Sequence, residues 1–337
     1  MSVFVAAFTA RGAALGGKIA RALGAELCTP ERLAAASHAE GFDSLAGWTA
    51  GVWPRAEAIV FVGAAGIAVR AIAPHVRDKF TDPAVVSVDE AGRFAVPLLS
   101  GHVGGANALA KRIAAVTGGV AAVSTATDVN GLFAVDAWAA ENSLAVSDRT
   151  LAKKVSAGLL EGKNIRLVSD WPVEGRPPRG VAADGEQEVY ITTKTEPRDK
   201  LRLIPRCVTL GIGCRRGAAF EEIDSLAREV LALSGTDLRA VGRVCSIDLK
   251  KDEAGLLEFC RSIGLSLTVF TPQELMAVPG EFAASDFVLR TTGADNVCER
   301  AAVCGGGELI VRKRARGGVT AACAAVRPKL IFREDDR

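Results

Sequence analysis

The stretch from Val96 to Asn107 is an apolar strand that breaks into a glycine-rich turn and then opens a helix. The helix is predicted by apolar side chains that recur with the i, i+3, i+4, i+7 spacing of one helical face. These side chains are Ala106, Leu109, Ala110 and Ile113. We expect the unpaired N–H groups of its first turn to face the loop. Free amides at the positive end of a helix dipole attract carboxylate or phosphate, so the junction is a candidate ligand site.

Strands and helices alternate through residues 1–147, which we predict to form an N-terminal α/β domain with glycine-rich loops. Short apolar runs between helical periods indicate a largely parallel sheet. The expected strands are Val3–Phe8, Ala58–Val62, Val85–Val88, Ala95–Leu99 and Val120–Val123. Glycine-rich turns follow the second and fourth of them, at 63–66 and 100–105. Because ligands of open α/β sheets gather at the carboxyl ends of strands, both turns are candidate binding loops.

Residues 148–206 interrupt this alternation, and we predict a central linker or small α+β module there. Its expected elements are a helix at Leu151–Leu160 and strands at Ile165–Val168 and Val189–Thr193. The consecutive prolines Pro177 and Pro178 forbid a helix between the two strands.

After Pro205 the alternation resumes, which predicts a C-terminal α/β domain over 207–330 and a tail over 331–337. The expected strands are Val208–Ile212, Val241–Ile247, Ser266–Phe270, Phe287–Arg290, Leu309–Arg312 and Val319–Val326. The expected helices are Glu221–Leu233, Glu253–Ile263 and about 295–304. The predicted fold is therefore two α/β domains with largely parallel sheets, a small central α+β region, and a substrate cleft between the domains.

The charge balance argues for a small-molecule partner. Lys and Arg number 41 against 39 Asp and Glu, so the chain has no strong field to collect nucleic acid or an anionic membrane. The eight cysteines form no C-x-x-C pair and have no histidines at zinc spacing, so we expect no protein-bound metal. Cysteines within apolar runs, and the lack of a secretory or membrane-spanning segment, favour the cytoplasm.

His102 stands among the glycines of the 100–105 turn, where a neutral imidazole could activate water or bind substrate. The alternative is a histidine that only locks its own turn. Arg70 and Lys79, beside the Gly66 turn, could pair with carboxylates, although such a cluster is more often a solvated face. Asp128 follows the strand at 120–123 and could be a base, although helix capping is the more common role.

In the C-terminal domain, Gly213, Arg215 and Arg216 repeat the strand, glycine turn and helix arrangement and suggest an oxyanion cradle. The segment 248–253 also follows a strand and presents Lys250, Lys251 and Glu253, which could face a ligand or simply begin a helix. Cys214 is the one thiol in a basic glycine loop, where its pKa could fall, but we consider a catalytic role less favoured than a structural one.

Taken together, these motifs resemble the cobalt-precorrin-5A hydrolase family of anaerobic cobalamin biosynthesis. The N-terminal segments that carry the resemblance are 66–74, 78–86, 100–107 and 124–128. The C-terminal segments are 210–217, 247–256, 273–275, 296–302 and 319–322. The resemblance covers essentially the whole chain in order, and the co-occurrence of these motifs is more specific than any one of them.

The resemblance implies hydrolysis of the δ-lactone that joins the ring A acetate to C20, followed by release of C20 and its methyl group as acetaldehyde. The other product would be cobalt-precorrin-5B. No cofactor is implied, because the substrate itself carries the cobalt. We expect His102 or Asp128 to activate water, with Glu253 as a third candidate acid–base residue, and the amides of 101–105 to stabilise the oxyanion.

The expected substrate-binding residues supply backbone amides and cations for the carboxylates of a corrinoid. They are Gly66, Arg70, Lys79, Ser100, Gly101, Gly104, Gly105, Asn107, Gly213, Arg215, Arg216, Lys250 and Lys251. Further possible partners are pathway methyltransferases, through transient contact, and a second copy of the chain.

The main alternative function is a non-catalytic carrier of a corrinoid intermediate, which would need the same cradle without a water activator. A nucleotide- or sugar-phosphate-binding α/β enzyme is a more distant alternative, because the chain has neither a Walker sequence nor a full dinucleotide fingerprint.

Overall fold

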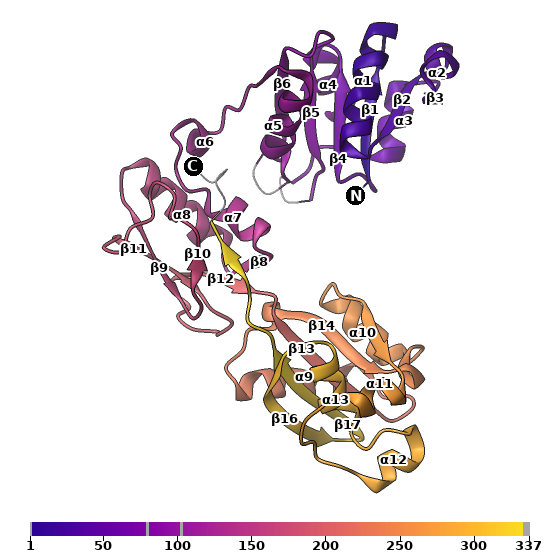
Figure 1. The fold of residues 1–337 in the computed structure, drawn as a ribbon, viewed down its shortest axis with the longest axis vertical. Helices are drawn as coiled ribbons and strands as arrows, with labels where there is room; N and C mark the ends of the chain where they lie inside the picture. The colour runs from indigo at the N-terminus through magenta and orange to yellow at the C-terminus, as the bar shows by residue number, and fades with distance from the viewer. Residues whose placement is uncertain (1, 79–80, 102–103, 333–337) are drawn as a thin grey trace. The chain divides into compact units, whose positions relative to one another are not determined.

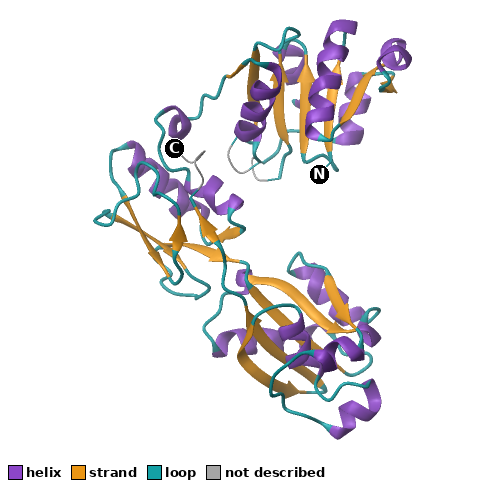
Figure 2. Ribbon diagram, in the orientation of Figure 1, coloured by secondary structure: helices purple, strands orange, loops and turns teal. Residues whose placement is uncertain are grey.

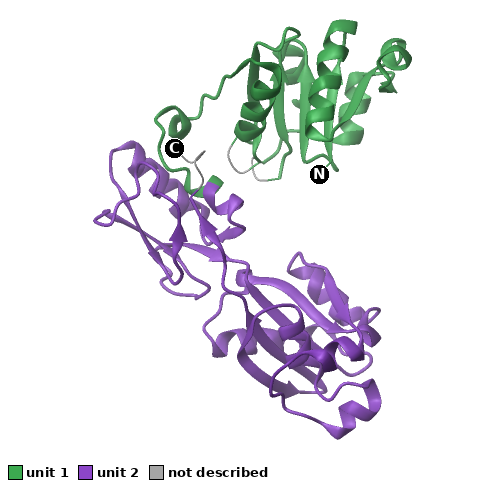
Figure 3. Ribbon diagram, in the orientation of Figure 1, with its two compact units in different colours: residues 1–137 green, residues 138–337 purple. Residues whose placement is uncertain are grey.

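The computed structural model describes residues 2–78, 81–101 and 104–332. The chain divides into two compact units, residues 1–137 and residues 138–337 (Figure 3). Residues 138–147, which we predicted with the first domain, therefore belong to the second unit. The α/β class is confirmed, with both parallel and mixed sheets (Figures 1 and 2). The substrate cleft between domains stays a prediction.

The first unit contains a seven-stranded sheet in the order β3-β2-β1-β4-β5-β6-β7. Its strands are β1 (Val3–Ala7), β2 (Glu26–Pro30), β3 (Glu40–Phe42), β4 (Ala58–Val62), β5 (Ala84–Val88), β6 (Phe94–Leu99) and β7 (Val120–Ala121). The five predicted strands are confirmed, with small shifts in their ends. Sequence reasoning missed β2 and β3, which are short and carry polar residues.

Helices cover both faces of this sheet (Figure 2). They are α1 (Ala10–Leu23), α2 (Glu31–Ser37), α3 (Leu45–Val52), α4 (Ala65–Ile72) and α5 (Ala106–Thr117). Two further helices follow the sheet in the chain, α6 (Ala126–Val129) and α7 (Val135–Glu141), and α7 crosses the unit boundary. Alternate residues of β4 face opposite layers: Val60 packs with α1 and α5, whereas Phe61 packs with α3 and α4. Burial on both faces explains why this strand is apolar throughout.

The strand β6 runs antiparallel to β5, which changes where its loop lies. Leu99 at the end of β6 pairs with Val85 near the start of β5. The 100–105 turn therefore leaves the sheet at the edge opposite the 63–66 turn, which follows β4. The two predicted binding loops therefore do not form one site at a common edge of the sheet. The signal was present, because only residues 89–93 join β5 to β6, and a parallel crossover needs a dozen or more residues.

The second unit begins with a four-stranded sheet in the order β8-β12-β11-β9. Its strands are β8 (Leu144–Val146), β9 (Ile165–Ser169), β11 (Gln187–Ile191) and β12 (Leu201–Pro205), and α8 spans Arg149–Leu160. The predicted helix and both predicted strands of this central module are confirmed. Its β8 and β12 were not predicted.

Residues 330–332 return to this central module. The strand β18 (Leu330–Ile331) pairs with β10 (Val173–Glu174). The buried Trp138 donates its indole N–H to the Ile331 carbonyl at 2.9 Å, and its ring lies 5.2 Å from that of Phe332. Residues 331 and 332 are thus part of the folded core, and the prediction of a tail from residue 331 is wrong for these two.

The C-terminal sheet has the order β15-β14-β13-β17-β16. Its strands are β13 (Val208–Cys214), β14 (Val241–Ile247), β15 (Leu267–Phe270), β16 (Glu308–Arg316) and β17 (Val319–Ala325). Its helices are α9 (Phe220–Leu233), α10 (Ala254–Ser262), α11 (Pro272–Ala277), α12 (Asp286–Thr292) and α13 (Val297–Cys304), and two 3-10 turns span Leu238–Ala240 and Asp248–Lys250. A side chain at Gly211 would collide with the Cys298 carbonyl, so this glycine lets α13 lie directly on the sheet.

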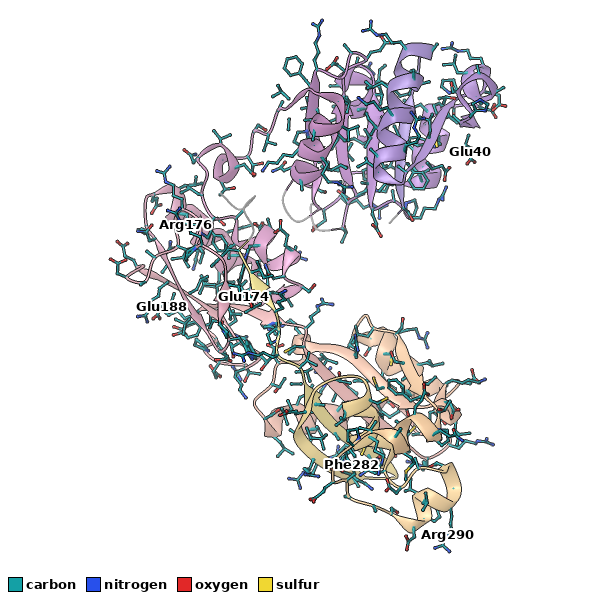
Figure 4. All side chains as sticks on the ribbon, viewed as in Figure 1. Glu40, Glu174, Arg176, Glu188, Phe282 and Arg290 are labelled. Atoms are coloured by element: carbon teal, nitrogen blue, oxygen red, sulfur yellow. The ribbon has the colours of Figure 1, made fainter. Side chains whose placement is uncertain are left out.

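The predicted strand at 287–290 is wrong, because this segment is the helix α12. The Ser285 hydroxyl caps the helix by accepting from the Val288 amide, and Gly293 ends it in the left-handed conformation. Its apolar run mimicked a strand, yet the Phe287 side chain is 74% exposed. Arg290 projects outward from the same helix (Figure 4).

A buried ionic network joins the central sheet to the C-terminal domain. Arg202 on β12 donates to the Asp237 carboxylate at 3.0 Å, and Arg239 donates to the same carboxylate at 2.7 Å. Arg239 also donates to the Ser147 carbonyl at 2.6 Å. Burial raises the pKa of Asp237, but the hydrogen bonds from the two arginines outweigh burial and lower the pKa to about 2.

Across the described residues, every helix is too short or too polar to cross a lipid bilayer.

Candidate functional site

Three of the sequence motifs meet at one edge of the first sheet. The strands β6 and β7 run parallel to each other, so the loops that follow them, 100–105 and 122–125, leave at the same edge. The connection from α4 to β5, at 73–83, reaches this edge as well, because β5 runs in the opposite direction. Because β6 is antiparallel to β5 and parallel to β7, the motifs at 78–86, 100–107 and 124–128 lie at the same edge of the sheet.

Asp82 and Ser100 tie two of these loops to each other. The buried Asp82 carboxylate accepts the amides of Arg77 at 2.8 Å and Asp78 at 2.9 Å. The Ser100 hydroxyl donates to the Asp82 carbonyl at 3.0 Å. Ser100 has a φ of +56°, which is strained for a residue other than glycine. A side chain at Gly104 would collide with Ser100, so the tight turn requires glycine there.

The first helical amides after this turn are not free. The Ala106 amide donates to the Ser100 carbonyl at 3.1 Å, and the Asn107 amide donates to the Gly101 carbonyl at 2.9 Å. The expectation that the first turn of α5 offers these amides to an anion is therefore wrong. Gly105 has a φ of +83°, and both amides are used by carbonyls of Ser100 and Gly101.

Asn107 is buried and holds the third loop. Its side-chain amide donates to the Thr125 hydroxyl at 2.8 Å and to the Asp128 carboxylate at 3.0 Å. Thr125 occupies the N-cap position of α6 and Asp128 lies in the first turn of this helix, so Asp128 is not the N-cap residue. Asn107 therefore positions the Asp128 carboxylate. The predicted contact between Asn107 and the substrate stays a prediction.

Lys111 is a residue that sequence reasoning missed. Its ammonium lies 3.7 Å from Asp128 Oδ1, and the two side chains are 54% and 20% exposed. Lys111 follows Asn107 by four residues, and this spacing places both on one face of α5. The i, i+4 relation was a signal that could have identified Lys111 from the sequence.

Other predicted residues lie elsewhere or outside the described part of the chain. His102 and Lys79 are outside the described residues. Gly66 and Arg70 belong to the opposite edge of the sheet, where the Arg70 guanidinium folds back over the first turn of α4. Because five-residue strands span about 15 Å, one small group cannot contact both edges.

The predicted residues of the C-terminal domain do gather at one edge. The parallel strands β13 and β14 end side by side, which brings the loops at 214–217 and 248–253 together. Glu253 is the clamp between them, because its carboxylate accepts the Gly217 amide at 2.6 Å and pairs with Lys250 at 3.2 Å. Burial raises the pKa of Glu253, but the Gly217 amide and Lys250 outweigh burial, so the pKa lies below its ordinary value.

The four cations of this edge differ in their pairing. Arg215 pairs with Glu222 at 2.9 Å and donates to the Gly317 carbonyl, and Lys250 pairs with Glu253. Arg216 and Lys251 are exposed and make no ion pair with any described residue. Arg216 and Lys251 are therefore better suited than Arg215 and Lys250 to bind an external anion.

Cys214 does not have the chemistry of a reactive thiol. Burial raises the pKa of Cys214 to about 11, and the nearby Lys250 does not overcome this effect. The expectation of a lowered pKa is wrong, because the thiol lies partly within the sheet rather than in the basic loop. Among the described residues, no three His, Cys, Asp or Glu side chains are grouped to hold a metal ion.

Comparison with known proteins identifies relatives over the whole chain. The family model "Cobalamin synthesis G N-terminal" matches residues 47–128, and "Cobalamin synthesis G C-terminus" matches residues 208–324. A cobalt-precorrin-5A hydrolase of Salmonella typhimurium is 33% identical, with 95% of this chain and 96% of the relative covered. A second one, of Priestia megaterium, is 30% identical, with 80% and 78% covered. The crystal structure of a cobalamin biosynthesis protein G homolog from Sulfolobus solfataricus aligns with a TM-score of 0.44 at 21% identity, covering 97% of each chain.

Proposed function

Because this chain belongs to the cobalamin synthesis G family, we propose that it hydrolyses cobalt-precorrin-5A, the substrate in the names of its curated relatives. The observation that carries the proposal is the 33% identity to a named hydrolase over 95% of the chain. Such coverage includes residues of both units.

The proposed reaction has two stages. Water adds to the carbonyl of the ring A acetate lactone, and the lactone C–O bond breaks to leave a carboxylate and a hydroxyl on C20. Deprotonation of that hydroxyl then breaks the bond between C20 and the macrocycle, and acetaldehyde leaves. The conjugated macrocycle accepts the electron pair and a proton, which gives cobalt-precorrin-5B.

Asp128 is the described carboxylate best placed to activate the water. Its two oxygens are held by Asn107 and Lys111, yet the side chain keeps 20% of its surface exposed. A positioned carboxylate that is partly exposed can accept a proton from water, as a general base must. His102, in the same loop region of the sequence, is the second proposed base. Glu253 is a weaker candidate because Gly217 and Lys250 occupy its carboxylate.

The carboxylates of the corrinoid call for cations and amides in the binding surface. For the C-terminal domain we propose Arg216 and Lys251 as the main anion-binding groups, since Arg215 and Lys250 have internal partners. Ser100, Gly101, Gly104 and Gly105 shape the loop beside Asp128, while Gly66, Arg70, Lys79 and Gly213 remain proposed contacts.

The test is anaerobic incubation of the purified protein with cobalt-precorrin-5A. Acetaldehyde is measured by coupled reduction while the corrinoid mass is followed. Catalytic release of acetaldehyde with the matching loss of mass would support the proposal. Stoichiometric binding with an unchanged mass would contradict it and favour the carrier function.

A further inference from the structure

The proposed hydrolysis needs a donor for the oxygen that becomes negative when water adds to the lactone carbonyl. The sequence suggested the amides of 101–105 for this purpose, and the two amides that follow them, of Ala106 and Asn107, donate to the Ser100 and Gly101 carbonyls. A preorganised donor near the developing charge is usually the largest single contribution to acyl-transfer catalysis. A side-chain donor close to Asp128 is therefore needed for the developing negative charge.

Lys111 supplies such a donor. Its ammonium lies 3.7 Å from Asp128 Oδ1, while the Asn107 side-chain amide donates to Oδ2 at 3.0 Å. An ammonium has three N–H donors, and a contact with Asp128 uses one of them. With 54% of its side chain exposed, Lys111 can direct the others toward a bound ligand.

We propose that Lys111 is a catalytic residue that stabilises the oxyanion of the opening lactone, next to Asp128 as the base. This inference rests on the proposed function. A carbonyl placed over the pair would have its oxygen at the ammonium and the attacking water at the carboxylate. Such a position satisfies the requirement that one reacting group lie within reach of both a base and an oxyanion donor.

The step balances without any further reactant. Asp128 takes a proton from water, the water oxygen bonds to the carbonyl carbon, and the carbonyl π electrons move to the oxygen at Lys111. When the tetrahedral intermediate collapses, the lactone C–O bond breaks. The proton held by Asp128 then passes to the C20 oxygen. The new ring A carboxylic acid releases the second proton of the water to solvent, which leaves a carboxylate beside the ammonium.

A structural role for Lys111 predicts different behaviour. Ion pairs between exposed side chains contribute little to stability, so loss of Lys111 should leave the thermal midpoint nearly unchanged. Arg112 offers a matched control, because it is the adjacent exposed cation on the same helix. Replacing either residue removes one positive charge from α5, but only Lys111 contacts Asp128.

The experiment compares Lys111→Met, Lys111→Arg and Arg112→Met with the unaltered protein in the acetaldehyde assay. Loss of one oxyanion donor lowers kcat by about 100- to 1,000-fold, and we expect this loss for Lys111→Met, with KM within about threefold. Lys111→Arg should recover part of kcat, and Arg112→Met should behave normally.

Near-normal kcat in Lys111→Met would overturn the inference, as would an equal loss in Arg112→Met. Failure of the unaltered protein to release acetaldehyde would instead overturn the proposed function, and the role of Lys111 with it. The two failures are distinguishable because all four proteins are assayed with the same substrate preparation.

Discussion

Replacing Asp237 with asparagine should destabilise the second unit by a predictable amount at neutral pH. The Asp237 carboxylate is paired with Arg202 and Arg239, and its pKa falls from the ordinary 3.8 to about 2. Each unit of pKa difference corresponds to about 1.4 kcal/mol, so the charged carboxylate contributes about 2 kcal/mol to folding. Asparagine keeps the shape but removes the charge and leaves Arg202 buried without its ionic partner.

The pH dependence has a definite sign. Because the pKa of Asp237 is lower in the folded state, its contribution is fully present above pH 4 and is lost as the pH falls toward 2. The difference in unfolding free energy between the unaltered protein and Asp237→Asn should therefore be largest at neutral pH. It should shrink as the folded protein takes up a proton at Asp237.

Urea denaturation followed by tryptophan fluorescence measures this difference, since Trp138 and Trp171 lie in the second unit. Asp224→Asn is the control, because Asp224 pairs with a more exposed arginine, Arg228, one helical turn away. Such helical pairs contribute about 0.2–0.5 kcal/mol. An Asp237→Asn variant that loses no more than the control at pH 7 would refute the reasoning.

Three further predictions concern the candidate sites. Ser100→Ala should destabilise the first unit by about 1–2 kcal/mol through the lost hydrogen bond to Asp82. Ser100→Gly should be the more stable of the two in urea denaturation, because glycine relieves the positive φ; the reverse order would exclude backbone strain. Glu253→Gln should lower kcat for acetaldehyde release far less than Asp128→Asn, since Glu253 acts as a loop clamp, and equal losses would restore Glu253 as a catalytic candidate. His102→Ala should abolish turnover but leave corrinoid binding measurable by absorbance titration, and near-normal turnover would remove His102 from the mechanism.

Much of the fold could be predicted from hydrophobic pattern. The apolar β4 and the helical stripe of α5 lie where the sequence placed them, because burial of these side chains determines both the element and its face. The strands β2 and β3 escaped prediction because partial exposure allows polar residues such as Glu26 and Glu40, which weaken the pattern.

The direction of β6 and the content of the candidate site were harder to predict. Strand direction depends on the connection, and the short link before β6 indicated a hairpin that the hydrophobic pattern alone does not show. Glu299 illustrates the second difficulty, because its partners Ala283 and Lys313 are 16 and 14 positions away in the sequence. Glu299 is completely buried and accepts the amides of Ala283 and Lys313 and the side chain of Asn296, so the motif around it is structural.

The return of β18 to the central module has a consequence for synthesis of the chain. Trp138 and its partner Ile331 are separated by 193 positions, so the module cannot close until the whole C-terminal domain has been translated. Domains generally fold in the order of their synthesis, and the first unit can therefore be complete while the hydrophobic pocket around Trp138 still awaits its last strand. During that interval the Trp138 side chain lacks its contacts with Ile331 and Phe332.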